Sequence, residues 1–194
     1  MNNYKINIVD GILYAINNLY NKNKISDNTI LIIPILDNGL EEILKIRNEI
    51  KNKIILILYE KYINKITDYS NIEIITIPNN MPNSEINFMA SDIKEEYLDS
   101  YIFDLSNEKE LETYFSKIIS KDIVSKYNNI DKIYIPFIYK SLYQGLYKYF
   151  KLVYDDIKII LINNNSYDIS DIEYDELLND LIDDESSSSI FISI

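Results

Sequence analysis

The side chains that could do chemistry in this chain carry oxygen or amine groups, because its 194 residues include no histidine and no cysteine. The commonest general base, the thiolate nucleophile and the usual zinc ligands are therefore missing. Asp37, Asn38 and Lys140 are the best placed polar residues, since each follows an apolar run that predicts a strand. Open α/β sheets bind ligands at the carboxyl ends of their strands. An enzyme or small-ligand site at that edge is therefore one interpretation, and carboxylates alone could hold Mg²⁺ there.

Other groups of polar or aromatic residues are better explained by structure. The pairs Glu41-Glu42 and Glu95-Glu96 fall in predicted helices, where adjacent side chains point in different directions. The stretch Asp37-Asn38-Gly39 also has the composition of a turn that begins a helix. Tyrosines between residues 139 and 154 lack the cluster of lysines that a single-strand binding surface needs, so they favour packing. The three glycines (Gly11, Gly39 and Gly145) form neither GxGxxG nor a Walker loop.

Predicted helices and strands alternate along the chain, and their order indicates how a site would be positioned. Apolar residues at helical spacing predict helices at 10–22, 40–50, 60–66, 84–98, 108–125 and 140–149. Runs rich in isoleucine predict strands at 30–36, 54–59, 72–77, 101–105, 132–138 and 157–162. This alternation predicts an α/β fold on a mainly parallel sheet with helices on both faces.

Composition suggests three parts. We expect a first α/β lobe at 1–100, a second α/β unit packed against it at 101–167, and an acidic, serine-containing tail at 168–194. The tail is acidic because it holds many aspartates and glutamates and because no lysine or arginine follows Lys158 in the sequence. We expect the tail to be disordered or to pack within the chain, although its apolar end could add a strand to a sheet edge. Four of its residues are candidates for contact with a partner: Asp183, Asp184, Glu185 and Phe191.

Charge and hydropathy argue against two classes of partner. The formal net charge is -12 and Arg47 is the single arginine, so a nucleic-acid surface of clustered cations is not expected. The longest apolar runs, such as residues 30–36, are far shorter than the roughly 20 residues of a membrane span. The first residues do not resemble a secretory signal, so we expect a cytoplasmic protein. Heavy use of isoleucine, asparagine, lysine, tyrosine and aspartate is typical of an AT-rich genome, as in some viruses.

Three stretches carry a resemblance to a known family. Val9-Asp10-Gly11 opens the first predicted helix, residues 34–40 place Asn38 after the first predicted strand, and residues 136–141 precede the last predicted helix. Over about residues 5–163, the order and spacing of these stretches resemble the cysteine synthase family, the fold type II pyridoxal-phosphate enzymes. In that family the first stretch is Lys-Asp-Arg, whose lysine binds the cofactor covalently, the second contains a matching asparagine, and the third is rich in glycine and binds phosphate.

The resemblance implies that the cofactor-binding positions are degenerate here. Valine stands at the lysine position, and bulky or polar residues replace the phosphate-binding glycines; the positions concerned are Val9, Asn38, Tyr139, Lys140 and Ser141. Most of the family's carboxyl-terminal portion is expected to be absent as well. The resemblance thus implies a truncated, catalytically inactivated relative without a cofactor.

We therefore expect a pseudoenzyme scaffold that is not an enzyme and that acts through a protein partner, for example as a structural or regulatory protein of a virus. Two alternatives stay open beside it. One is the atypical ligand or catalytic site at the carboxyl edge of the sheet, and the other is a regulatory subunit of an active cysteine-synthase-like enzyme. A homodimer is also compatible with the sequence.

Overall fold

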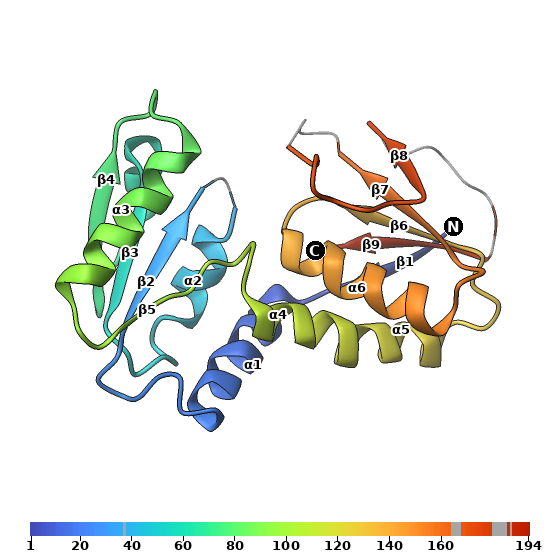
Figure 1. Ribbon diagram of the computed structural model, residues 1–194, viewed down its shortest axis with the longest axis horizontal. Helices are drawn as coiled ribbons and strands as arrows, with labels where there is room; N and C mark the ends of the chain where they lie inside the picture. Colours follow the sequence, from blue (N-terminus) through green and yellow to red (C-terminus); the bar gives the residue numbers. More distant parts are fainter. Residues whose placement is uncertain (37, 164–167, 180–185, 187) are drawn as a thin grey trace. The chain divides into compact units, whose positions relative to one another are not determined.

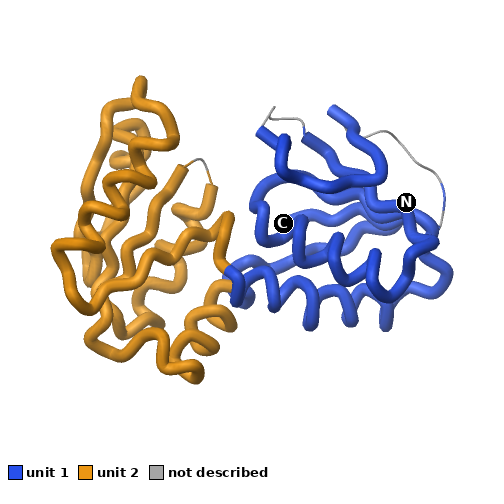
Figure 2. The backbone as a smooth tube through the Cα atoms, in the orientation of Figure 1, with its two compact units in different colours: residues 1–11, 109–194 blue, residues 12–108 orange. Residues whose placement is uncertain are grey.

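The chain consists of two compact units (Figure 1; Figure 2). The computed structural model describes residues 1–36, 38–163, 168–179, 186 and 188–194. Unit 1 comprises Met1–Gly11 together with Lys109–Ile194, and unit 2 comprises Ile12–Glu108. These bounds differ from the expected divisions at 1–100, 101–167 and 168–194. The reason is that the first strand pairs with residues from the end of the chain, which places both in unit 1.

Unit 2 is built on a four-stranded parallel sheet in the order β4-β3-β2-β5. Its strands are β2 (Ile30–Ile35), β3 (Ile54–Tyr59), β4 (Ile72–Ile77) and β5 (Ser100–Ile102). Its helical segments are α2 (Leu40–Ile46), the 3-10 turn η1 (Glu60–Lys65), α3 (Asn83–Glu96) and most of α1 (Ile8–Asn21), which starts in unit 1.

The sheet of unit 2 is covered on both faces, which explains why its strands read as continuous apolar runs. On one face, Ile86, Ala90 and Ile93 of α3 pack in one cluster with Ile32, Ile55 and Ile57 of the two inner strands. Side chains alternate between the faces of a strand, and the β3 residues that point the other way (Ile54, Leu56 and Leu58) are fully buried too.

Unit 1 is built on a five-stranded parallel sheet in the order β1-β9-β6-β7-β8. Its strands are β1 (Asn2–Lys5), β6 (Lys132–Pro136), β7 (Lys158–Ile162), β8 (Glu176–Leu178) and β9 (Ser189–Ser193). Strand β9 is an inner strand: Ile192 lies opposite Tyr4 of β1, and Ile190 lies opposite Ile133 of β6. Two strands of this sheet therefore come from the residues expected to form a tail.

The helices of unit 1 are α6 (Lys140–Val153) and one long segment in three parts: α4 (Lys109–Tyr114), the π-helical turn η2 (Phe115–Ile119) and α5 (Ser120–Lys126). In a π turn, backbone hydrogen bonds join residues that are five apart. The hydroxyl of the buried Ser120 also donates to the carbonyl of Phe115 at 3.0 Å. Gly145 of α6 lies against this turn. A Cβ at Gly145 would be 2.6 Å from the carbonyl oxygen of Glu112 and 2.8 Å from Cβ of Phe115. The close approach of the two helical segments therefore requires glycine.

The predicted fold class is confirmed: both units are α/β, and all the strand pairs in the two sheets are parallel. The predicted helices and the longer predicted strands are present, with ends that differ by a few residues. Within the residues that the structure describes, no helix combines the length and the apolar character needed to span a bilayer.

Substituting Gly145 by alanine tests the close helix contact. We expect Gly145→Ala to lower the free energy of unfolding by about 2 kcal/mol, because the new methyl group must push the α4–η2 backbone away. Equilibrium urea unfolding followed by circular dichroism measures the change. The neighbouring Gln144→Ala is the control, since it also places alanine in α6 but at a partly exposed position. Equal stability of the two variants would contradict this account of the packing.

Candidate functional site

The carboxyl ends of the strands in each unit are the places where sequence analysis puts the site. In unit 2, Asn38 is exposed and follows β2, and the buried Gly39 begins α2 with φ of 99°. This left-handed backbone is one that glycine adopts without strain. Leu36, just before the turn, packs against the cluster under α3. Asp37 lies outside the described residues.

In unit 1, the turn from β6 into α6 is filled by large side chains. Tyr139 and Ser141 are buried, and the ring of Phe137 lies edge-on to the ring of Tyr143, with centroids 6.3 Å apart. Tyr139 precedes the helix with φ of -128°, an ordinary extended conformation. The described residues with a left-handed backbone lie elsewhere, at Asn23, Gly39, Asn71 and Asn129. This turn therefore has a packed interior and no left-handed residue.

Residues 171–175, which we call the acidic strap, run along one face of α6. Lys140, at the start of the helix, forms an ion pair with Asp171. Lys151, near its end, forms an ion pair with Asp175 at 2.5 Å. Positions 140, 143, 147 and 151 share this face because they are three or four residues apart. The two lysines of the face are thus neutralised by the strap.

A buried tyrosine fixes the middle of the acidic strap. The hydroxyl of Tyr143 donates to the carbonyl of Glu173 at 2.9 Å, and its ring stacks on that of Tyr147 at 5.7 Å. Burial raises the pKa of Tyr143 well above its usual range, and neighbouring groups including Tyr147 and Asp175 add to the rise. Burial, Asp175 and Glu173 raise the pKa of Tyr147 as well. Both side chains are therefore neutral phenols at physiological pH, and neither is suited to act as a base.

Pyridoxal phosphate, the cofactor that the resemblance implies, does not fit the residues at these positions. A phosphate held by backbone N–H groups needs a turn that lets the backbone approach it closely, usually through glycine. The β6–α6 turn instead holds Phe137, Tyr139 and a lysine already paired with the acidic strap. Val9, at the position of the family's lysine, is a partly buried residue of α1 and cannot form a covalent link to an aldehyde.

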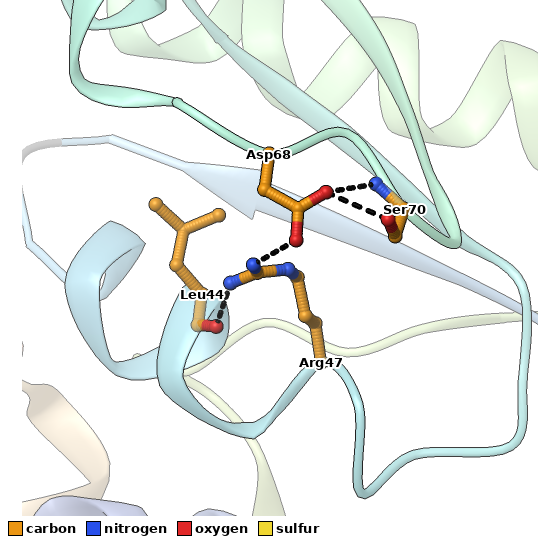
Figure 3. Close-up of polar contacts among 4 residues, drawn as sticks. All are labelled: Leu44, Arg47, Asp68 and Ser70. Atoms are coloured by element: carbon orange, nitrogen blue, oxygen red, sulfur yellow. Dashed lines mark hydrogen bonds and ion pairs between the residues drawn. The ribbon is translucent and has the colours of Figure 1, made fainter.

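The single arginine of the chain makes a structural contact in unit 2 (Figure 3). The guanidinium of Arg47 donates to Asp68 at 2.5 Å and to the carbonyl of Leu44, which ties the end of α2 to the segment before β4. Asp68 also accepts hydrogen bonds from the hydroxyl and the N–H of Ser70, at 2.7 and 2.9 Å. The Ser70 hydroxyl, followed by the Arg47 guanidinium, holds the pKa of Asp68 well below its usual range. Figure 3 shows these contacts, which leave Nε of Arg47 as a buried donor without a hydrogen-bond partner among the described residues.

A groove of about 230 Å³ lies in unit 2 near the amino ends of β2 and β3, away from the carboxyl ends where the site was expected. It is lined by one face of α1 and by the loops before those strands, through Leu13, Ile16, Asn17, Tyr20, Asp27, Glu49, Ile50 and Lys51. Beside it, the buried Asn52 accepts a hydrogen bond from Tyr20 at 2.5 Å and donates to the carbonyls of Ser26 and Thr29. These hydrogen bonds hold the loops beside the groove together, so Tyr20 and Asn52 have a structural role there.

The remaining predicted residues are distributed as follows. Phe191 lies in β9, where its partly buried ring packs against Tyr134, Ile160 and Ile162. Asp183, Asp184 and Glu185 lie outside the described residues. No group of three or more acidic side chains placed to hold a metal ion occurs within the described ranges. Asn38 belongs to unit 2, whereas Tyr139, Lys140 and Ser141 belong to unit 1.

Sequence reasoning missed the acidic strap. Its signal was the alternation of Asp171, Glu173 and Asp175 with less polar residues, which fits an extended segment with every second residue on one side. Lysines at both ends of the same α6 face were the matching signal.

Removing the hydroxyl of Tyr143 tests the contact between α6 and the acidic strap. We expect Tyr143→Phe to lower the free energy of unfolding by about 1 kcal/mol, because the carbonyl of Glu173 loses its donor. Amide hydrogen exchange of residues 171–175 should also become faster. Tyr147→Phe, which removes the hydroxyl of the ring stacked on Tyr143, is the matched control. An unchanged exchange rate in Tyr143→Phe would show that this hydrogen bond does not hold the strap.

The shifted carboxylate of Asp68 gives a test by pH. Because its pKa is lower in the folded chain than the unfolded value of about 3.9, its stabilising effect is present above about pH 4 and is lost as the pH falls further. We expect Asp68→Asn to be less stable than the wild type near neutral pH, and the difference to shrink in acid. Urea unfolding at a series of pH values measures it, with the exposed Asp92→Asn as control. A pH-independent difference would contradict this assignment.

Comparison with known proteins adds the fold relationship. No protein-family model and no curated protein matches the sequence. Among solved structures, the chain is similar to O-acetylserine-dependent cystathionine beta-synthase from Helicobacter pylori, with a TM-score of 0.72 and 15% identity over 95% of this chain and 66% of the other.

Two further solved structures agree. A hydrogen sulfide-producing enzyme from Fusobacterium nucleatum gives a TM-score of 0.70 at 14% identity, over 86% of this chain and 57% of that one. A mutant of O-ureido-L-serine synthase with bound O-ureido-L-serine gives 0.67 at 10% identity, over 80% and 50%. The chain thus spans between half and two thirds of the length of these proteins. At this identity the likeness concerns the fold, and it confirms that this chain has the α/β fold of the cysteine synthase-like, fold type II pyridoxal-phosphate enzymes.

Proposed function

We propose that this chain is a non-catalytic protein, a pseudoenzyme with a cysteine-synthase-like fold, that works by binding another protein. A structural or regulatory role in a virus is one setting that the AT-rich composition suits. The observation that carries the proposal is the β6–α6 turn, where the buried Tyr139, the partly buried Phe137 and the Lys140–Asp171 ion pair take the place of a glycine-rich phosphate loop.

Two further observations support this proposal. Val9 stands in α1 at the family's lysine position, so the covalent link to the cofactor has no amine there. The pKa values of Tyr143 and Tyr147, which follow the turn in α6, are raised, so neither phenol is suited to act as a base. A fold that keeps its strands and helices while its ligand-binding turns are filled is better suited to present surfaces than to hold a small substrate.

Two other functions compete with this proposal. A ligand site at the carboxyl edge of unit 2 would use the exposed Asn38 beside Gly39. A regulatory subunit of an active enzyme with the same fold is favoured by the TM-scores of about 0.7 to the solved enzymes. The first predicts binding of small polar molecules that Asn38→Ala weakens, and the second predicts a complex with a cysteine-synthase-like enzyme of the same cells.

Cofactor binding is the direct test. We expect pyridoxal phosphate added to the purified chain, then fixed with borohydride, to label only surface lysines, at a stoichiometry that rises with cofactor concentration without a plateau. Mass spectrometry of the peptides identifies the labelled residues. Saturable labelling of one lysine, together with turnover of an amino-acid substrate, would overturn the proposal.

The partner is sought with the whole chain as bait. Removing residues 168–194 would delete β8 and the inner strand β9, so a truncated bait would lose the sheet of unit 1. The chain is cross-linked to its neighbours in the native cells. The destabilised variant Gly145→Ala serves as a control bait: proteins that it captures more strongly than the wild type are chaperones that recognise unfolding. We expect one protein at a fixed ratio to the wild-type bait, displaced by an excess of untagged chain. A chain recovered without such a protein would favour the small-ligand alternative.

A further inference from the structure

Strand β4 forms one edge of the sheet of unit 2, with β3 on its inner side (Figure 1). The N–H of Ile54 in β3 donates to the carbonyl of Asn71, and Ile54 lies opposite Ile72. In a parallel pair, backbone groups of alternate residues point to the same side. The N–H and C=O groups of Ile74 and Thr76 therefore point away from β3, as does the carbonyl of Ile72. In the described part of the chain, no strand pairs with this side of β4.

Most devices by which proteins protect an edge strand are missing from β4. Natural edges are kept short or carry lysine, proline or a bulge. Strand β4 has six residues, whereas the other edge strands β1, β5 and β8 have four, three and three. Its sequence is Ile-Glu-Ile-Ile-Thr-Ile, and four of these side chains are only partly buried: Ile72, Ile74, Ile75 and Thr76. The edge is therefore long, regular and rich in residues that favour strands.

The one charge on β4 is already compensated. The carboxylate of Glu73 forms an ion pair at 2.6 Å with Lys53, which stands just before β3. The side chain of Glu73 points to the same face as Ile75 and Ile77, where α3 packs. The outward N–H and C=O groups belong to other residues of β4, so another strand can pair with them without breaking the ion pair between Lys53 and Glu73.

We propose that the β4 edge binds the β4 edge of a second copy of this chain, in antiparallel orientation, and joins the two sheets of unit 2 into one of eight strands. An isologous contact of this kind needs a self-complementary register. With the two-fold axis at Ile74, this residue faces the partner's Ile74, and Thr76 faces the partner's Ile72.

This register satisfies the outward groups except the carbonyl of Thr76. The two Ile74 residues exchange two hydrogen bonds, and each Thr76 N–H reaches the carbonyl of the partner's Ile72. The N–H of Ile72 is not needed, because it already donates to Tyr69 at 3.1 Å. Four intermolecular hydrogen bonds result, and Glu73 faces the partner's Ile75 rather than another acid. A second copy is favoured over an unrelated peptide because the same six residues supply a partner for every outward group except the carbonyl of Thr76, and no like charges face each other.

Charge reversal at the axis tests this register. In Ile74→Lys two ammonium groups face each other, and in Ile74→Glu two carboxylates do, so we expect either variant alone to weaken self-association at least about tenfold, which corresponds to about 1.4 kcal/mol. A mixture of the two variants should associate again, because lysine then faces glutamate. Sedimentation velocity over a concentration series measures the association. Ser91→Lys and Ser91→Glu, on the exposed side of α3, are the matched controls.

A cross-link gives a second measurement that does not depend on charge. The chain has no cysteine, so Ile74→Cys introduces a single thiol. Residues that exchange hydrogen bonds across an antiparallel pair have Cα atoms about 5.5 Å apart, within the range of a disulfide. We expect oxidation to yield a covalent dimer of Ile74→Cys and not of the control Ser91→Cys.

The outcomes separate this proposal from the proposed function. A wild-type chain that stays monomeric at high concentration, or a dimer that Ile74→Lys and Ile74→Glu leave intact, would overturn the β4 pairing. Neither result bears on cofactor binding or on a partner captured from cells, since those experiments concern the β6–α6 turn and other surfaces. Recovery of the dimer only in the mixed sample would establish both the edge and its register.

Discussion

The pairing of β9 with both β1 and β6 is the contact on which the sheet of unit 1 depends. Without it, β1 has no neighbour, and β6 keeps only β7. The buried side chains of Ile190 and Ile192 join residues from the two ends of the chain in one core. Unit 2 is in contrast a continuous stretch, Ile12–Glu108. All the strands of its sheet come from this one stretch. Because contacts between distant residues form slowly, unit 2 has the topology that favours earlier folding.

Helix α6 connects the other features of unit 1. One side of it touches the π turn through Gly145, and the face of Lys140 and Lys151 is bound by the acidic strap. These contacts are made at the start, the middle and near the end of α6, all with residues of unit 1. The turn before this helix contributes Tyr139 and Ser141 to the buried interior. The stability of unit 1 and the filling of this turn thus depend on the same helix.

The sequence predicted the elements whose signals are local. Residues 30–35 and 54–59 are unbroken apolar runs, and they form the two inner strands of unit 2. Strand β1, with the sequence Asn-Asn-Tyr-Lys, has no such signal, and β8 has only three residues. Strand β9 follows a run of serines, and its apolar residues were expected at most to add a strand to a sheet edge, whereas β9 is an inner strand. Strands β1 and β9 pair with each other across more than a hundred residues, and β8 is an edge strand that pairs with β7. No pattern within these three strands specifies their partners.

The positions taken from the family resemblance were located correctly as turns and helix starts, because spacing along the chain reflects the order of the fold. Asn38 and Gly39 do directly precede α2, and residues 139–141 do span the start of α6. What spacing could not predict is the role of Asp171 as the partner of Lys140. This ion pair depends on a side chain from a segment 31 residues further along.

The arrangement of β1 and β9 has a mechanical consequence. The strands are parallel neighbours, with Asn2 opposite Ile190 and Lys5 opposite Ser193. A pull on Asn2 and Ser193 in opposite directions along the strands would load all the hydrogen bonds between them at once, in shear, rather than opening them one after another like a zipper. Tension applied through these two residues would therefore meet its resistance at the pair of strands that holds unit 1 together.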